Sequence, residues 1–174
     1  MRYVIVSVVK GEAGNFNNNL RKEVFEKFHA KSSKLPAHFT IKAPFECDLI
    51  DEVDNVIENF CNNHNKAKYT LEDYGHFDNR VVYMKVHMSE EGKILHNNLI
   101  DELEKIDFIN FQSYDGKNKV FHVTISSKKI QKIYDELWDY VNKIPFKFNC
   151  FFDNICIYKW EDNTWKLHKE FNLK

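Results

Sequence analysis

Hydrophobic and polar positions recur along the chain with two periodicities. A period of two residues is typical of strands, and a spacing of three to four residues is typical of helices. A β-rich run from Tyr3 to Val9 opens the chain. An apolar stripe comes next and predicts an amphipathic helix through Phe16, Leu20, Val24 and Phe28. Strand and helix patterns then continue to the C-terminus.

The later patterns predict three more helices and at least five more strands. Ser89 precedes two glutamates and is a plausible N-cap for one of these helices. We expect helices at about 53–64, 90–106 and 130–141, and strands at about 69–74, 80–87, 146–152, 155–160 and up to Phe171.

Two further segments, at about 36–44 and 120–126, alternate apolar residues with a histidine and a threonine. Their polar faces carry His38, Thr40 and Lys42 in the first and His122, Thr124 and Ser126 in the second. With eight histidines and four threonines in 174 residues, roughly 0.2 His-x-Thr tripeptides are expected by chance. Two occur, each followed by isoleucine, so chance does not account for the pair.

The order of predicted elements after each motif segment is the same: motif strand, helix, strand, strand. The first strand after the helix begins 31 residues after His38 and 24 residues after His122, and the difference lies in the connection after the first motif. An internal duplication explains both the repeated motif and the repeated order. It predicts a pseudo-twofold arrangement in which the two motif strands face each other across a cleft.

The motif residues are suited to phosphate-ester chemistry. Within each motif the histidine and threonine Cβ atoms lie about 7 Å apart on one side of a strand, a span that a phosphate fits. Near neutral pH one imidazole can accept a proton while the other donates one. Each threonine hydroxyl can donate to a nonbridging phosphate oxygen, and Lys42, Lys128 or Lys129 could add positive potential. No metal is required, and no cluster of His, Cys, Asp or Glu has metal-ligand spacing.

Length and composition predict one folded domain over residues 1–174, in which we expect the two lobes to be interleaved. The chain is 43% hydrophobic, has only five glycines and three prolines, and contains no linker-like run. The formal net charge is −1, with basic and acidic residues mixed along the sequence. We therefore expect no footprint for long nucleic acids, whereas a nucleotide or short RNA needs only a few local donors.

The four cysteines have no Cys-x-x-Cys spacing and are interpreted as reduced, mostly buried thiols. The apolar run near the N-terminus is too short for a membrane span and is not followed by a cleavage site. We expect a cytoplasmic protein that does not associate with membranes, and a monomer.

The pair HFTI and HVTI resembles the signature of the 2H phosphoesterase superfamily, which includes bacterial 2'-5' RNA ligase-like proteins and cyclic phosphodiesterases. The segment HFTIKAPF, the spacing of 84 residues between the histidines and the segment 75–81 extend the similarity over essentially the full chain. The resemblance implies an α+β fold of two pseudo-twofold lobes, each an antiparallel sheet with outer helices, flanking a central cleft. The residues projecting into that cleft would be His38, Thr40, His122 and Thr124.

The resemblance also implies cleavage of 2',3'-cyclic phosphate or 2'-5' phosphodiester bonds without metal or cofactor. Phe77 and Arg80 belong to a segment that lies near the cleft in this family, where an aromatic ring could stack on a base and an arginine could meet a phosphate. Tyr158, on a late strand, is a similar candidate for which core packing is the simpler interpretation.

Two alternatives remain open. A module of the same fold could bind a nucleotide without turning it over, although a pure binder has no need of two titrating groups. An RNA 2'-5' end-joining activity would need a longer cleft with basic rims, which the near-neutral charge disfavours.

Overall fold

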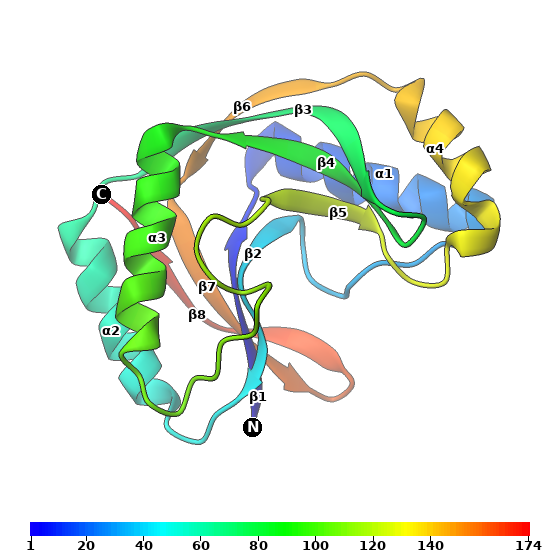
Figure 1. Ribbon diagram of the computed structural model, residues 1–174. Coiled ribbons are helices and arrows are strands. Elements are labelled where there is room, and N and C mark those ends of the chain that lie inside the picture. Colours follow the sequence, from blue (N-terminus) through cyan, green and yellow to red (C-terminus); the bar gives the residue numbers. More distant parts are fainter.

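The structure of the protein is a computed structural model that describes residues 1–174 (Figure 1). Helices and strands alternate along most of the chain, and a short 3₁₀ turn at 131–133 precedes the last helix. The helices are α1 (Gly11–Phe28), α2 (Ile50–Asn63), α3 (Glu90–Glu104) and α4 (Tyr134–Asn142). The strands are β1 (Arg2–Val8), β2 (His38–Glu46), β3 (Ala67–Phe77), β4 (Val81–Met88), β5 (His122–Ser126), β6 (Lys147–Phe152), β7 (Asn154–Glu161) and β8 (Thr164–Asn172).

The strands form two antiparallel sheets of four, in the orders β2-β1-β7-β8 and β5-β4-β3-β6. Each motif strand, β2 or β5, is an edge strand, and the two edges contact each other. Helices α2 and α3 pack side by side, while α1 and α4 cover the other end of the second sheet (Figure 1). The expected α+β fold of two antiparallel sheets with outer helices is confirmed.

The two sheets are not built from consecutive halves of the chain. The first motif strand, β2, pairs with β1 at the start of the chain. The second motif strand, β5, pairs with β4. Strand β3, which follows α2, nevertheless joins β4 in the second sheet, and the first sheet is completed by β7 and β8 from the C-terminus. The predicted element order is thus correct, and the first sheet takes its strands from both ends of the chain.

One hydrophobic core joins the two sheets. Phe39, with no exposed surface, lies at its centre and makes edge contacts with three aromatic rings. Its ring centroid lies 5.7 Å from that of Tyr69, 5.5 Å from that of Phe121 and 5.1 Å from that of Phe152. Because side chains alternate along a strand, burial of Phe39 turns its neighbours His38 and Thr40 to the opposite face.

The first motif strand is longer than the sequence pattern predicts. Pro44 was expected to end it, yet β2 continues to Glu46. The pairing of β1 with β2 has a register shift in this region, and β2 is an edge strand, so Pro44 interrupts no ladder between two neighbours. The predicted Ser89 cap is confirmed, since the Gly92 amide donates to its hydroxyl oxygen at 3.1 Å.

All four cysteines are unpaired, and Cys47, Cys61 and Cys156 are buried, as predicted. None of the four helices combines the length and the apolar content that a membrane-spanning helix needs.

Replacing Phe39 by alanine is expected to lower the free energy of unfolding by about 3–5 kcal/mol, because it leaves a cavity where the two sheets meet. Urea unfolding measures this loss. Phe151, which is 44% exposed, provides the matched control, and its alanine variant should lose less than about 1 kcal/mol. A similar small loss for Phe39→Ala would contradict the central role assigned to this ring.

Candidate active site

Strand alternation presents the four motif residues on the faces turned away from the core. His38 and Thr40 lie opposite Val8 and Val6 of β1, and all four side chains point to the same side of the first sheet. In the second sheet His122 lies opposite Lys85, and Thr124 opposite Tyr83. Each of the four motif residues is half-buried, so its polar atoms remain open to a ligand.

Both motif histidines make the same hydrogen bond to the backbone. His38 Nδ1 donates to the Pro36 carbonyl oxygen at 2.7 Å, and His122 Nδ1 donates to the Val120 carbonyl oxygen at 3.1 Å. A carbonyl oxygen can only accept, so Nδ1 carries the hydrogen in both rings and Nε2 holds the free lone pair. The two halves therefore present equivalent tautomers.

The surroundings favour the neutral form of both rings. The pKa of His38 is lowered to about 4, mainly by burial and to a smaller extent by the positive charges of Arg21 and His122, while the Pro36 hydrogen bond acts in the opposite direction. Burial also lowers the pKa of His122, with a smaller contribution from Lys119. Strands β2 and β5 contact each other, and the charge of a protonated His122 contributes to the lowered pKa of His38.

A cavity of about 450 Å³ lies beside Thr40 and His122. Phe77 forms part of its wall, and residues 113–120 of the connection between α3 and β5 form most of the rest. This connection therefore decides which groups can reach one end of the motif strands.

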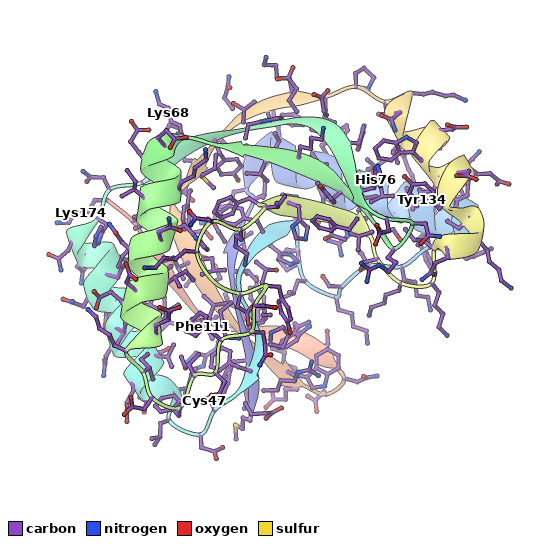
Figure 2. The ribbon with its side chains drawn as sticks, viewed as in Figure 1. Cys47, Lys68, His76, Phe111, Tyr134 and Lys174 are labelled. Carbon is purple, nitrogen blue, oxygen red and sulfur yellow. The ribbon has the colours of Figure 1, made fainter.

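A buried ion pair anchors the wall of this cavity. Asp115 is 1% exposed, and its carboxylate accepts from the Lys42 ammonium at 2.7 Å and from the Ala43 amide at 2.9 Å. The Gln112 amide also donates to it, at 3.3 Å. Figure 2 shows Phe111 close to this end of the first sheet, and the Lys42 ammonium lies 5.3 Å from its ring centroid.

The expected position of Lys42 on the polar face with His38 and Thr40 is wrong. The pairing with β1 shifts register after Thr40, so that Lys42 lies opposite Ile5, which faces the core. A β-bulge breaks the period of two and turns the next side chain to the other side. Lys42 thus binds Asp115 inside the protein and does not line the cavity.

Lys119 takes the position near the motif that Lys42 was expected to hold. Its ammonium donates to the carbonyl oxygens of Thr40 at 2.9 Å and Ile41 at 3.1 Å, and its side chain lines the cavity. An ammonium has three N–H groups, so one remains for a ligand. Burial lowers the pKa of Lys119 to about 8. No pattern in the sequence singles out this loop lysine.

Phe77 lies against the second motif histidine and lines the 450 Å³ cavity. Its ring is perpendicular to that of His122, with centroids 5.0 Å apart, and Tyr83 lies 5.2 Å from His122. Gly75 makes room for Tyr83, because a Cβ atom at this position would lie 2.5 Å from the tyrosine ring. The neighbouring residue His76 points to the other face, toward Tyr134 of α4 (Figure 2).

The other two candidates lie farther out. Arg80 is at the β3–β4 turn, where its exposed guanidinium pairs with Asp78 at 3.0 Å, and it does not line the cavity. Tyr158 lies opposite Val4, on the same face of the first sheet as His38. It packs against the small apolar cluster around Val4 and Val6, so its contacts are those of a packing residue.

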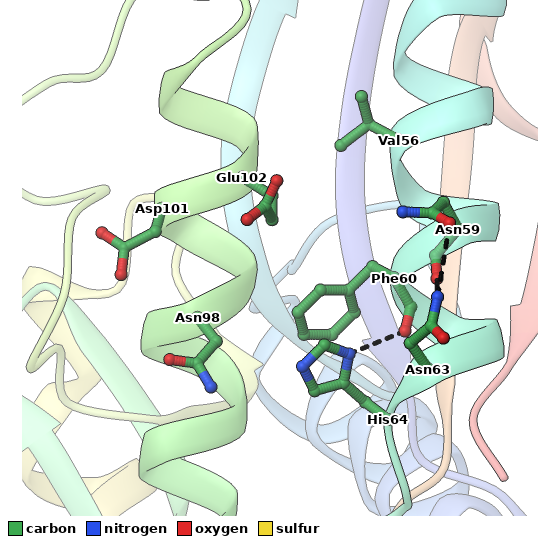
Figure 3. Close-up of a pocket in the computed structure, with 8 residues that line it drawn as sticks. All are labelled: Val56, Asn59, Phe60, Asn63, His64, Asn98, Asp101 and Glu102. Atoms are coloured by element: carbon green, nitrogen blue, oxygen red, sulfur yellow. Dashed lines mark hydrogen bonds between the residues drawn. The ribbon is translucent and has the colours of Figure 1, made fainter.

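A separate hollow of about 390 Å³ lies between α2 and α3 (Figure 3) and contains no motif residue. His64 stacks on Phe60 there, with centroids 3.9 Å apart, and its Nδ1 donates to the Phe60 carbonyl oxygen. His64 is thus a partly buried packing residue. No group of three or more His, Cys, Asp or Glu residues in the protein is arranged to hold a metal ion.

Several solved structures share this fold at low sequence identity. The protein TT0787 of Thermus thermophilus is 14% identical, with a TM-score of 0.68 over 99% of this chain and 98% of that chain. E. coli LigT complexed with 3'-AMP is 15% identical, with a TM-score of 0.66 over 99% and 98%. E. coli LigT complexed with NADP+ is 14% identical, with a TM-score of 0.65 over 99% and 97%. No curated protein sequence matches this chain.

The sequence model of the 2'-5' RNA ligase superfamily matches residues 13–164, a span that includes both His-x-Thr motifs. The match agrees with the two interleaved sheets, and the chain belongs to the 2'-5' RNA ligase superfamily.

Proposed function

We propose that the protein is a metal-independent phosphodiesterase that cleaves 2',3'-cyclic phosphate or 2'-5' phosphodiester bonds of nucleotides or short RNA. The matched hydrogen bonds of His38 and His122 carry the proposal, because they leave Nε2 of each imidazole free for proton transfer. A purely structural histidine pair would not need equivalent tautomers on the open faces of two strands.

In the hydrolysis of a cyclic phosphate, one neutral imidazole removes a proton from the attacking water through Nε2. The water oxygen bonds to phosphorus while the P–O bond of the ring breaks. The second imidazole, in its protonated form, gives its Nε2 proton to the leaving oxygen, and the two histidines exchange states. Which of the two begins as the base depends on how the substrate lies.

The hydroxyls of Thr40 and Thr124 would donate to the nonbridging oxygens, on which negative charge increases in the transition state. The free N–H of Lys119 adds a charged donor at the Thr40 end. A base could stack on Phe77 in the adjacent cavity. The nucleotide complexes of LigT, which shares the fold, support a nucleotide as ligand here.

His38→Asn and His122→Asn are each expected to lower kcat by about 10²–10⁴-fold, the contribution of a positioned acid or base. The assay is hydrolysis of nucleoside 2',3'-cyclic phosphates and 2'-5' dinucleotides, with and without EDTA. EDTA should leave the activity of the native protein unchanged. His29→Asn is the matched control, because His29 is exposed and its left-handed backbone, with φ 55°, accepts asparagine. Full activity of either motif variant would exclude the mechanism.

The lowered pKa values of the free histidines predict an acidic optimum for kcat/KM. Turnover needs one neutral and one protonated imidazole, and above both pKa values this form declines about tenfold per pH unit. We expect a bell-shaped kcat/KM profile with its maximum below pH 6.5. The profile of kcat should peak at higher pH, because a bound phosphate anion raises both pKa values. A kcat/KM that rises steadily up to pH 8 would rule out this pairing of acid and base.

Lys119→Met is expected to lower kcat/KM by about 10²-fold, the cost of losing one preorganised donor to a developing charge. Lys105→Met is the control, since Lys105 is exposed and pairs with Glu102 on α3. Urea unfolding of both variants measures the structural part of the effect, because Lys119 also holds the carbonyl groups of β2. Unchanged kcat/KM in a folded Lys119→Met protein would remove this residue from the site.

A further inference from the structure

A second groove, of about 530 Å³, collects basic side chains that are far apart in the sequence. It lies between α1, the segment after α1 and the end of β5. Five of its eleven lining residues are basic and none is acidic. The basic residues are Arg21, Lys22, Lys31, Lys34 and Lys128. The net charge of the whole chain, −1, gives no sign of this local excess of positive charge.

The groove adjoins the motif strands at the end opposite the 450 Å³ cavity. Its floor is a bridge between Lys31 and Lys128, in which the Lys128 amide donates to the Lys31 carbonyl oxygen at 3.1 Å. Lys128 follows the β5 strand that carries Thr124, and Lys34 precedes the β2 strand that begins at His38. The cavity, by contrast, adjoins Thr40 and His122.

Arg21 fixes the wall of the groove. Its guanidinium donates to Ser32 Oγ at 2.8 Å and to the carbonyl oxygens of Ser33 at 2.6 Å and Leu35 at 2.9 Å. Its charge also lowers the pKa of His38, so the groove and this imidazole are within electrostatic reach. The segment that leads into the first motif is thus held in one conformation.

A nucleoside 2',3'-cyclic phosphate carries a single phosphate, and the motif residues can hold that group by themselves. Of the five cations, Arg21 donates to the wall of the groove, and the Lys34 ammonium donates to the Asn163 carbonyl oxygen at 2.5 Å. An anion in the groove would still be attracted by the positive charge of all five. The ammonium groups of Lys22, Lys31 and Lys128 are on exposed residues and make no ion pair within the protein. They remain available to ligand phosphates.

We propose that this basic groove binds phosphates of the substrate other than the one that is cleaved. The inference rests on the proposed phosphodiesterase function and narrows its substrate class. The substrate carries at least one phosphate beyond the scissile one, either in an oligonucleotide chain or in a diphosphate attached to the same nucleoside.

Binding to the His38→Asn/His122→Asn protein, which does not consume its ligands, tests the groove by calorimetry. The ligands are adenosine 2',3'-cyclic phosphate, its 5'-diphosphate derivative, and the di- and triadenylates that end in the same cyclic phosphate. Each added phosphate in the groove should lower Kd by about three- to tenfold and steepen the dependence of log Kd on log salt by about 0.7.

The added substitutions Lys22→Gln, Lys31→Gln and Lys128→Gln should remove the gain in affinity. Lys68→Gln is the matched control, because Lys68 is exposed on β3 far from the groove (Figure 2), and it should keep the gain. A gain with the diphosphate alone, or with the oligonucleotides alone, supports the groove and identifies the source of its phosphates. Equal Kd for all ligands, or an undiminished gain after the three substitutions, would overturn the proposal.

Turnover by the native protein is measured separately. Absence of turnover beside length-dependent binding would reject the proposed catalysis and keep the groove. Turnover of all four ligands at equal kcat/KM, with equal Kd values, would reject the groove and keep the catalysis.

Discussion

The edge contact between Phe39 and Phe121 determines where the proposed active site of this protein lies. One ring follows the first motif histidine and the other precedes the second, and both are buried where the two sheets meet. Because side chains alternate along a strand, burying these rings places His38 and His122 on the opposite faces. Hydrophobic packing of these two rings thus orients the polar site. The two imidazoles have equivalent positions because each is next in sequence to a buried phenylalanine.

Much of this arrangement could be predicted from the sequence, and the failures have identifiable causes. The period of two in HFTI and HVTI predicts the faces of all four motif residues, since both segments are regular strands up to the threonine. The alternation predicts the wrong face for Lys42, because a bulge follows Thr40 and reverses the order of the faces. Lys119 lies in a loop without periodicity, and the residues of the basic groove meet only through folding, so no local pattern reveals them.

The two ends of the site differ although its centre is nearly symmetric. A loop anchored by the Lys42–Asp115 ion pair closes the end beside Thr40 and His122, and an aromatic ring lines it. The opposite end, toward Lys34 before β2 and Lys128 after β5, is basic. With equivalent tautomers in both halves, the histidines alone do not distinguish one orientation of a substrate from the other. In the proposed reaction, the unequal ends would give the substrate one preferred direction across the two histidines.

The first sheet contains strands from both ends of the chain, and this affects when the sheet can form during synthesis. Strand β1 has β2 on one side and β7 on the other, and Tyr3 pairs with Lys159 near the far end of the sequence. The sheet that bears the first motif is therefore incomplete until nearly the whole chain has left the ribosome. The first motif cannot be separated from the C-terminal part of the chain without losing β7 and β8 from its sheet, whereas all four strands of the sheet that bears the second motif lie within residues 67–152.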